Sequence, residues 1–358
     1  MNHKISVVIP VYNKEAYIKQ CLSRALSQDV DDYEVIAVDD GSTDASGAIC
    51  DQMASEHSRL KVVHTKNGGV TAARRKGVEA ARGQYVMFCD SDDALLPHAL
   101  RNVLEAMLAN DVDEVIAPYQ NQFGMIKDSG RRGMIAPADI IKDYLGLRNN
   151  FPPIWGILLR RDIILSGCLD IPREIYLGED ILFHIRYLTK VSKVFCIGQS
   201  CYVYSEGITS YPRINLDYES RYDELMQSAL RPLWSEMEPF FRLRQLKVYE
   251  KFIDDRQFDV YERYYHTLKG HLSHHVSFPE RLAFALPPRL AYYLVHGING
   301  GYVASQDEYT YSIGICLNLL LRNDIIFENH LMSGKMLLKC DNTIKSCNRP
   351  LLTRENLR

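Results

Sequence analysis

The stretch YVMFCDSDD, Tyr85 to Asp93, decides the fold of this 358-residue chain. Five largely apolar residues run directly into Asp90-Ser91-Asp92-Asp93. A continuous apolar run closed by polar residues is typical of a strand that is buried on both faces of a parallel sheet. Because three carboxylates at the end of such a strand repel one another, we expect a cation beside them.

The residues on either side repeat this pattern through the first 120 positions. Strands are predicted at 5–10, 33–40, 60–65, 85–90 and 112–118. Helices are predicted between them at 14–28, 42–57, 68–83 and 97–110. Ser42, Thr43 and Asp44 are candidate N-caps of the second helix, and Gly83 is a candidate C′ residue of the third. Strands alternating with helices predict an α/β fold with a Rossmann-like, mostly parallel sheet flanked by helices.

The pattern changes in the second half of the chain. It weakens between 121 and 150, and a helix (177–190) and a strand-like segment (192–205) follow. Beyond about Tyr211 the sequence is mainly helical. We therefore predict a catalytic domain at 1–212 and a mainly helical region at 213–358. The sequence leaves open whether that region serves a substrate, a partner or a membrane surface.

Composition bounds the class of protein. The chain is 46% hydrophobic and 24% charged, as in soluble globular proteins, and its net charge of -3 gives no sign of a nucleic-acid partner. Nine cysteines without a C-x-x-C pair indicate reduced thiols in a cytoplasm. No apolar run reaches the ~18 residues of a membrane span, and no signal peptide is evident. The sequence predicts a cytoplasmic protein, with peripheral contact at the inner face of the membrane as an alternative.

Polar residues follow four of the predicted strands. Tyr12, Asp39, Asn67 and Asp90 each lie at or just after a strand's carboxyl end. In open α/β sheets ligands bind outside these ends. We therefore expect the four segments to form one binding edge.

Asp90 and Asp92 are the predicted metal ligands. Residues two apart in an extended segment point to the same side, so both carboxylates could bind one hard cation, Mn²⁺ or Mg²⁺. The alternative is an acidic cap for the following helix, a role that suits Asp93.

Two further acidic pairs have competing readings. In VDDGSTD, Asp39 could accept hydrogen bonds from a nucleotide base or ribose, whereas Asp40 better fits a turn that binds the Gly41 and Ser42 amides. Glu179 and Asp180 at a helix start could be a general base or an ordinary capping pair.

Several ordered segments together resemble glycosyltransferase family 2, which has the GT-A fold. They are SVVIPVYNKEAYIKQCLSRALSQ, YEVIAVDDGSTDAS, NGGVTAARRKGVEAARGQYVMFCDSDD and LGEDILFHIRYL, and the likeness extends over about residues 5–210. The resemblance implies transfer of a sugar from a nucleotide diphosphate donor to an acceptor hydroxyl. It also implies inversion at the anomeric carbon and, usually, a divalent metal.

The resemblance also implies roles for donor-side residues. Pro10, Tyr12 and Asp39 would line the nucleotide base. Arg74 would approach the donor phosphates or ribose, and Asp90 would meet the ribose.

The metal and the base follow from the same resemblance. Asp92, with Asp90, would hold the metal, and Asp180 would be the general base, with Glu179 as the other candidate. From the residues alone, no G-x-G-x-x-G and no Walker loop is present, so the charge that neutralises the donor diphosphate must come from elsewhere. A metal at Asp90 and Asp92 would supply it.

Three departures from the family pattern stand out. Gly156-Ile157 follow Trp155, where the family often has Asn-Lys. The Trp155 ring either forms the bottom of the acceptor pocket or is buried in the core. Arg75 stands where the family has an asparagine, and its side chain could lie on the helix surface or contact a donor phosphate. Family members often have an arginine directly after the tyrosines of the last strand, whereas here Ser205 follows Tyr202 to Tyr204.

The C-terminal region offers only weak signals. His271 and His275 lie at i, i+4 but lack the glutamate of a zinc-protease motif, so a surface cluster is favoured over a metal site. Basic residues mixed with aromatics could suit an anionic lipid-linked acceptor, or a solvated helix face. They are Arg242, Arg244, Lys247, Lys251, Arg256 and Arg263.

The sequence thus predicts an inverting glycosyltransferase that adds one sugar, with a UDP-sugar as the first choice of donor. The acceptor would be a glycan or a lipid-linked molecule in bacterial surface polysaccharide or glycoconjugate assembly, and a homo-oligomer remains open. One alternative, a sugar-phosphate nucleotidyltransferase, should have a glycine-rich basic loop where PVYNKEAY stands. The other is an inactive nucleotide-binding scaffold.

Overall fold

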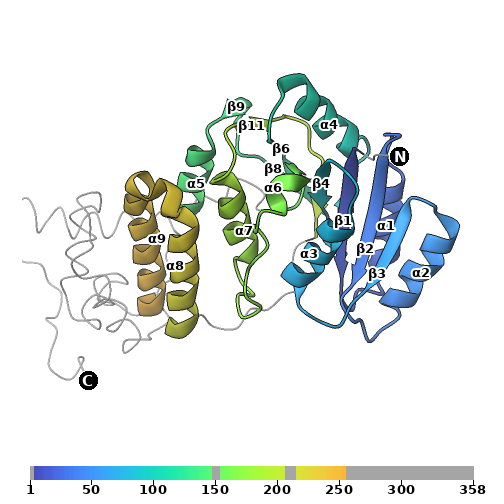
Figure 1. Ribbon diagram of the computed structural model, residues 1–358, viewed down its shortest axis with the longest axis horizontal. Coiled ribbons are helices and arrows are strands. Elements are labelled where there is room, and N and C mark those ends of the chain that lie inside the picture. Colours follow the sequence, from blue (N-terminus) through green and yellow to red (C-terminus); the bar gives the residue numbers. More distant parts are fainter. Residues whose placement is uncertain (1–3, 147–153, 206–214, 255–358) are drawn as a thin grey trace, which may run out of the picture. The chain divides into compact units, whose positions relative to one another are not determined.

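The computed structural model describes residues 4–146, 154–205 and 215–254 (Figure 1). The chain divides into two compact units, 1–241 and 242–358. The boundary predicted between 212 and 213 falls inside the first unit but outside the described residues, so the catalytic domain 1–212 stays a prediction. The predicted pair His271 and His275, and the basic residues beyond 254, also lie outside the described residues.

An eight-stranded sheet forms the centre of the first unit, in the order β3-β2-β1-β4-β10-β6-β11-β9. The strands β3 (Leu60–His64), β2 (Tyr33–Asp39), β1 (Ile5–Val11) and β4 (Tyr85–Phe88) run parallel, which confirms the predicted arrangement. The strand β10 (Ile157–Arg160) was not predicted. It lies antiparallel between β4 and β6 (Glu114–Ile116).

The far side of the sheet completes the mixed pattern. There β11 (Val194–Cys196) is parallel to β6, and the edge strand β9 (Gly133–Ile135) is antiparallel to β11. The fold is therefore of the α/β class, and its sheet is mixed but mostly parallel, as expected.

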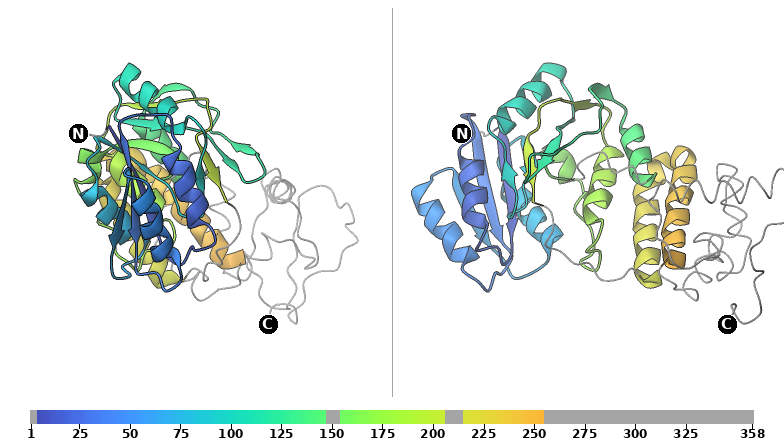
Figure 2. Two further views of the ribbon diagram at one scale, coloured as in Figure 1. Left: turned by 90° about the vertical axis from the view of Figure 1, so that its right-hand side faces the viewer. Right: turned by 180° about the vertical axis from the view of Figure 1, so that it is seen from behind.

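Helices cover both faces of the sheet (Figures 1 and 2). Val35 and Ala37 of β2 belong to the main core, together with residues of α1 (Ile18–Leu26), α2 (Ser46–Glu56) and α4 (Ala99–Asn110). The alternate residues Ile36 and Val38 cluster instead with Ala73 of α3 (Val70–Ala80). Period-two alternation along one strand thus separates the two helical layers.

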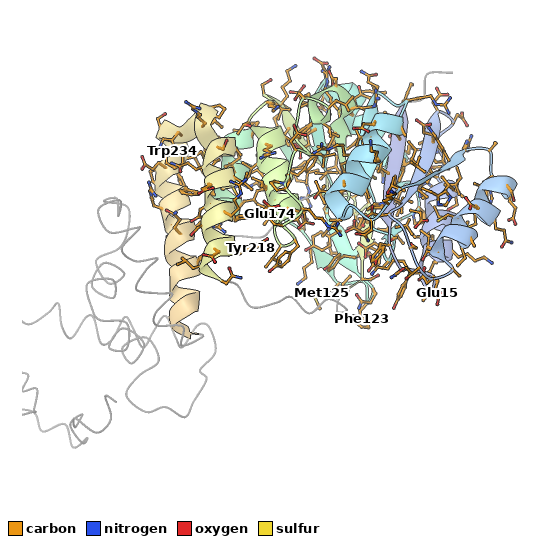
Figure 3. The ribbon with its side chains drawn as sticks, turned by 60° about the horizontal axis from the view of Figure 1, so that its bottom comes forward. Glu15, Phe123, Met125, Glu174, Tyr218 and Trp234 are labelled. Atoms are coloured by element: carbon orange, nitrogen blue, oxygen red, sulfur yellow. The ribbon has the colours of Figure 1, made fainter. Side chains whose placement is uncertain are left out.

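A small second sheet joins segments from three parts of the chain, in the order β5-β12-β7-β8. Its strands are β5 (Ala94–Leu95), β12 (Tyr202–Tyr204), β7 (Tyr119–Asn121) and β8 (Ile126–Lys127). Phe123 and Met125 are exposed at the turn between β7 and β8 (Figure 3). Because β5 follows the Asp90–Asp93 stretch directly, this sheet brings β12 beside it.

The remaining helices follow the second half of the chain. They are α5 (Pro137–Leu145), α6 (Arg161–Ile164), α7 (Glu179–Leu188), α8 (Leu216–Leu230), η1 (Arg231–Leu233) and α9 (Trp234–Asp254). Met226 and Leu230 of α8 are buried in the main core. Among the helices of the described residues, none combines the length and apolar character of a membrane span.

Two predicted helix ends were wrong. Ala45 occupies the N-cap position of α2, and Asp44 instead accepts a hydrogen bond from the Ser46 amide at 2.9 Å. Gly83 lies beyond the end of α3 and is not its C′ residue. A Cβ at Gly83 would lie 2.6 Å from the Ser6 amide nitrogen, so glycine is needed there for close backbone approach.

Candidate functional site

The carboxyl ends of β1 and β2 lie side by side, as predicted. Val11 pairs with Asp39, and the two following loops are joined by hydrogen bonds. The Thr43 amide donates to Asn13 Oδ1 at 2.8 Å, and the Asn13 amide donates to Ser42 Oγ at 3.1 Å. These loops form one continuous edge.

Pro10 and Tyr12 lie at this edge in different environments. Pro10 is buried in β1, two residues past Val8, the last residue of β1 that pairs with β4. Its missing N–H therefore costs no hydrogen bond with β4. Tyr12 is 46% exposed, so its ring is accessible to a ligand.

Asp39 is a buried carboxylate at the end of β2. Its Oδ1 accepts the Ser42 amide at 2.9 Å, and its Oδ2 lies 2.9 Å from His64 Nδ1. Burial alone would raise the pKa of Asp39, but the bonds from Ser42 and His64 hold it below the usual value. The hydrogen bonds to Asp39 and Asp51 raise the pKa of His64. Asp39 is thus ionised near neutral pH.

The reading of Asp40 as the turn-stabilising residue was wrong. Asp39 makes the bond to the Ser42 amide. Asp40 accepts the amides of Gly68 and Gly69, each at 2.8 Å, and the Thr65 hydroxyl at 3.1 Å. Asp40 therefore anchors the loop that leads into α3.

Arg74 connects the two halves of the predicted site. Its buried guanidinium places Nη2 2.8 Å from Asp90 Oδ1 and Nη1 3.6 Å from Glu179 Oε1. Burial disfavours the charged form, but the charges of Asp90 and Glu179 raise the pKa of Arg74. One buried cation thus contacts a predicted donor-side residue and a predicted base-side residue.

Asp92 is paired with Lys14, which the sequence reasoning did not single out. Lys14 Nζ lies 2.5 Å from Asp92 Oδ2. The expected extended geometry of Asp90 to Asp92 was wrong, because the Asp93 amide bonds the Asp90 carbonyl at 3.0 Å and closes a turn. The sequence could have indicated Lys14, because it is a basic residue in the loop that follows the first strand.

Asp93 does not cap the following helix, since His98 occupies the N-cap position of α4. It is buried, and it accepts bonds from the Tyr202 hydroxyl and the Ser205 amide, both at 2.7 Å. Burial and the neighbouring charge of Asp90 raise the pKa of Asp93 to about 7. The mutual repulsion of the three acids is thus relieved by Arg74, Lys14 and a shifted pKa.

Glu179 and Asp180 occupy the first turn of α7. Burial and the charge of Asp180 raise the pKa of Glu179 to about 7, and burial raises that of Asp180. Asp180 Oδ1 accepts the amide of Ile181 at 2.7 Å. Adjacent buried acids with raised pKa values are typical of a proton-accepting site, although structural pairs show the same shifts.

Trp155 lies in an aromatic cluster beside the end of β4. Its ring stacks on Tyr202 and Tyr204 with centroids 5.0 and 5.1 Å away, and Tyr119 meets it edge-on at 4.6 Å. Only 8% of Trp155 is exposed. The acceptor-side role stays a prediction, and these contacts give Trp155 a packing role as well.

The metal site at Asp90 and Asp92 stays a prediction. Asp90 and Asp92 offer carboxylate oxygens, the donor type that Mg²⁺ and Mn²⁺ prefer. The portion of the chain that the structure describes holds no group of three or more His, Cys, Asp or Glu side chains able to bind a metal. Mg²⁺ bound by one or two carboxylates with substrate phosphates requires no such group.

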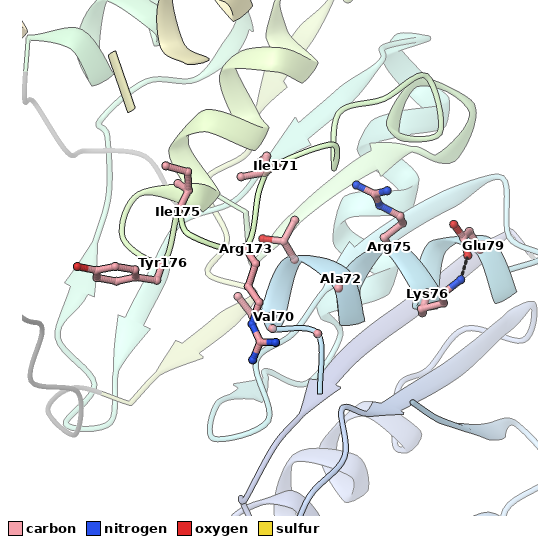
Figure 4. A pocket seen from close by; sticks show the side chains of 12 residues that line it. Val70, Ala72, Arg75, Lys76, Glu79, Ile171, Arg173, Ile175 and Tyr176 are labelled. Carbon is pink, nitrogen blue, oxygen red and sulfur yellow. Dashed lines mark hydrogen bonds and ion pairs between the residues drawn. The ribbon is translucent and has the colours of Figure 1, made fainter. Parts of the chain in front are cut away.

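A cavity of about 520 Å³ lies beside the first half of α3 (Figure 4). It is lined by the start of α3 and by Ile171 to Tyr176, and it contains none of the predicted site residues. Arg75 lines it too. Its guanidinium lies 2.9 Å from Asp170 and also bonds the Leu169 carbonyl, so Arg75 holds the loop before α7.

Comparison with known proteins agrees with this architecture. The model of the family Glycosyl transferase family 2 matches residues 6–165. An uncharacterized glycosyltransferase of Haemophilus influenzae is 41% identical over 212 residues, which are 59% of this chain and 79% of that protein. The poly(ribitol-phosphate) beta-glucosyltransferase of Bacillus spizizenii is 29% identical over 56% of this chain and 32% of its own length.

A solved structure shares the fold. Residues 1–349 of S. aureus TarS, in complex with UDP, superpose with a TM-score of 0.61 at 18% identity, over 97% of this chain and 98% of that one. The chain spans about half the length of the curated relatives it matches, from 31% to 66% in four of them. On the family match and the Haemophilus influenzae relative, this chain belongs to glycosyl transferase family 2.

Proposed function

We propose that the protein is an inverting glycosyltransferase that moves one sugar from a UDP-sugar to an acceptor hydroxyl. The observation that carries this proposal is the buried Arg74 guanidinium, which joins Asp90 on the donor side to Glu179 beside the candidate base. Donor binding and proton removal must occur within a few ångströms of each other in such a reaction, and Arg74 links the residues for both.

The donor nucleotide would lie across the carboxyl ends of β1, β2 and β4. Tyr12 offers an exposed ring for the base, and the ionised Asp39 would accept a hydrogen bond from base or ribose. Asp90 would meet the ribose. The choice of UDP is supported by TarS, whose fragment was solved with UDP and with UDP-GlcNAc.

Asp92, together with Asp90, would hold Mn²⁺ or Mg²⁺ against the donor diphosphate. When bound, the metal supplies positive charge that stabilises the departing nucleoside diphosphate. Lys14 neutralises Asp92 in the protein alone. Lys14 would therefore release Asp92 when the donor enters, and its ammonium group would then be free to bind a phosphate oxygen.

The acceptor hydroxyl would lose its proton to Asp180. Inversion requires attack from the sugar face opposite the leaving diphosphate, so the base and the diphosphate lie on opposite sides of the anomeric carbon. A general base works best when its pKa approaches the working pH, and burial moves Asp180 in that direction. Glu179 is the alternative base.

The setting we propose is assembly of a bacterial surface polysaccharide or glycoconjugate inside the cell. The glucosyltransferase relative acts on poly(ribitol-phosphate), as its name states, which supports a polymeric acceptor. The cysteines that the structure describes are free thiols, as in a reducing compartment. The proposal also includes contact of the protein with the membrane surface and association of this chain with copies of itself.

Release of UDP tests the donor and the metal. We would incubate the protein with UDP-glucose, UDP-galactose or UDP-N-acetylglucosamine, each with Mn²⁺, Mg²⁺ or EDTA, and measure UDP with water as the acceptor. We expect release from one donor that needs the metal. Asp92→Asn should lower the rate at least 10-fold, and Glu105→Gln, an exposed acid on α4, should not change it. Binding of UDP without turnover of any donor would favour an inactive scaffold.

The base is tested by a second pair of variants. Asp180→Asn should abolish UDP release while UDP with Mn²⁺ still raises the unfolding midpoint, because that binding does not need the base. At 100 times its dissociation constant a ligand stabilises the native state by about 2.7 kcal/mol. If Asp180→Asn stays active and Glu179→Gln does not, Glu179 is the base.

A further inference from the structure

The turn that carries Glu179 and Asp180 is held by two tyrosines of α8. The Leu177 amide donates to the Tyr218 hydroxyl at 2.8 Å, and that hydroxyl donates to the Leu177 carbonyl at 2.7 Å. The Tyr222 hydroxyl donates to the Gly178 carbonyl at 2.9 Å. Figure 3 shows Tyr218 on α8 beside the loop that carries Glu174. The backbone groups of Leu177 and Gly178, just before α7, are therefore bound by side chains from α8.

The backbone at Gly178 leaves little freedom in this turn. Gly178 is in the left-handed region, with φ of 78°, and it is the N-cap residue of α7. A Cβ at this position would lie 2.9 Å from the Tyr222 hydroxyl oxygen. Glycine is therefore required both by the dihedral angle and by the close steric contact with Tyr222.

The tyrosines themselves are well fixed. Tyr222 is 4% exposed, and the Tyr218 and Tyr222 rings are nearly parallel with centroids 6.4 Å apart. Asn215 Oδ1 accepts the Tyr218 amide at 2.9 Å and caps α8 at the turn where Tyr218 lies. A rigid α8 thus presents both hydroxyls at set positions.

The positions of the Glu179 and Asp180 carboxylates depend on this turn. Glu179 is the next residue after Gly178, and Asp180 the one after that, so a rotation of the Leu177–Gly178 peptides would move both acids relative to Arg74 and Asp90. Burial raises the pKa of the Tyr218 phenol to about 12, and the negative charge of Glu179 adds to this.

We propose that Tyr218 and Tyr222 are positioning residues for sugar transfer, which fix the turn before α7 and so place the general base against the donor. The inference rests on the proposed function, and it gives α8 a role in the reaction. The tyrosines act through the backbone of Leu177 and Gly178 and need not touch the substrate.

Tyrosine-to-phenylalanine variants test this, since each removes one hydroxyl and keeps the ring. For Tyr218→Phe, Tyr222→Phe and Gly178→Ala in the full chain, we would measure UDP release from the donor that the wild type uses, with kcat and KM separated. We expect kcat to fall about 10- to 100-fold, the loss typical of a small misplacement of a reacting group. The donor KM and the midpoint shift with UDP and Mn²⁺ should change less than about twofold, and the pH at which kcat is half-maximal should move.

The matched control is Tyr176→Phe. Tyr176 lies in the same loop and its ring contacts Tyr218 at 4.8 Å, but it is 43% exposed and bonds neither peptide of the turn. Its kcat should be unchanged.

The outcomes separate the two proposals. If both tyrosine variants unfold at a lower temperature but keep the wild-type kcat per UDP-binding site, the hydroxyls only stabilise the fold and the inference is overturned. A wild type that releases UDP from no donor would instead overturn the proposed function. Should a variant fail to fold, the remaining two still decide the question, since each disturbs the same turn from a different atom.

Discussion

Arg74 shows how one side chain can decide the electrostatics of the site. It is the buried cation between Asp90 and Glu179, at 2.8 and 3.6 Å. Removing one partner of a buried ion pair costs about 3–5 kcal/mol. The acids here keep 27% and 15% of their side-chain surface exposed, so we expect Arg74→Met to destabilise the protein by about 3 kcal/mol, near the lower limit.

Urea unfolding at pH 7 measures this loss. Arg24→Met, an exposed arginine on α1, is the control and should change stability by less than about 0.5 kcal/mol. Equal stability of Arg74→Met and wild type would show that the acids are protonated and do not need the cation.

Asp93 should make stability depend on pH. In the folded protein its pKa is about 7, whereas its ordinary value is 3.8. The folded state therefore binds a proton that the unfolded chain has lost, and stability decreases as pH rises between these two values, by at most about 1.4 kcal/mol per pH unit. Asp93→Asn cannot ionise, so its stability relative to wild type should rise steadily from pH 5 to pH 7.

Urea unfolding of both proteins at each pH tests this. Glu179 also has a raised pKa, of about 7, so Asp93→Asn should keep a weaker decline of its own. Parallel curves for the two proteins would rule out the proposed protonation of Asp93.

At the scale of elements, α3 packs on the sheet through a glycine. A Cβ at Gly77 would lie 2.2 Å from Val8 Cγ1 of β1 and 3.2 Å from Val38 Cγ2 of β2. In a free helix, alanine is favoured over glycine by about 1 kcal/mol. The clash should outweigh this gain, because overpacking a core costs about 1–3 kcal/mol and here both strands are central.

We therefore expect Gly77→Ala to destabilise the protein by about 1–2 kcal/mol, measured by the urea midpoint. Lys76→Ala, at the neighbouring exposed position, is the control and should have little effect, since it removes only a surface pair with Glu79. A more stable Gly77→Ala would mean that α3 can move away from the sheet at little cost.

The elements differ in how far the sequence predicts them. The parallel strands and the edge that collects Asp39 and Asp90 follow from apolar runs with polar ends, a local signal. The antiparallel strand β10 does not, because its four residues enter between β4 and β6 through pairings that only tertiary structure sets. The partners of the acids are equally non-local, as the Tyr202–Asp93 bond joins residues 109 apart in the sequence.

At the scale of the whole molecule, the point at which the catalytic domain ends can be tested. The sequence predicts an end at 212, whereas the compact unit extends to Phe241 and includes α8. If α8 positions the base, a chain ending at 212 lacks the hydroxyls of Tyr218 and Tyr222. It also exposes the core surface that Met226 and Leu230 cover.

Two shortened chains test this point. We expect residues 1–241 to unfold in one cooperative transition and to gain stability from UDP with Mn²⁺. Residues 1–212 should unfold at a lower temperature and release no UDP from the donor, because the turn before α7 is no longer held. Burying a large apolar side chain contributes about 1.5–3 kcal/mol, so losing Met226 and Leu230 alone should lower the midpoint by several degrees. Full activity in 1–212 would confirm the boundary predicted from the sequence and show that the reaction does not need α8.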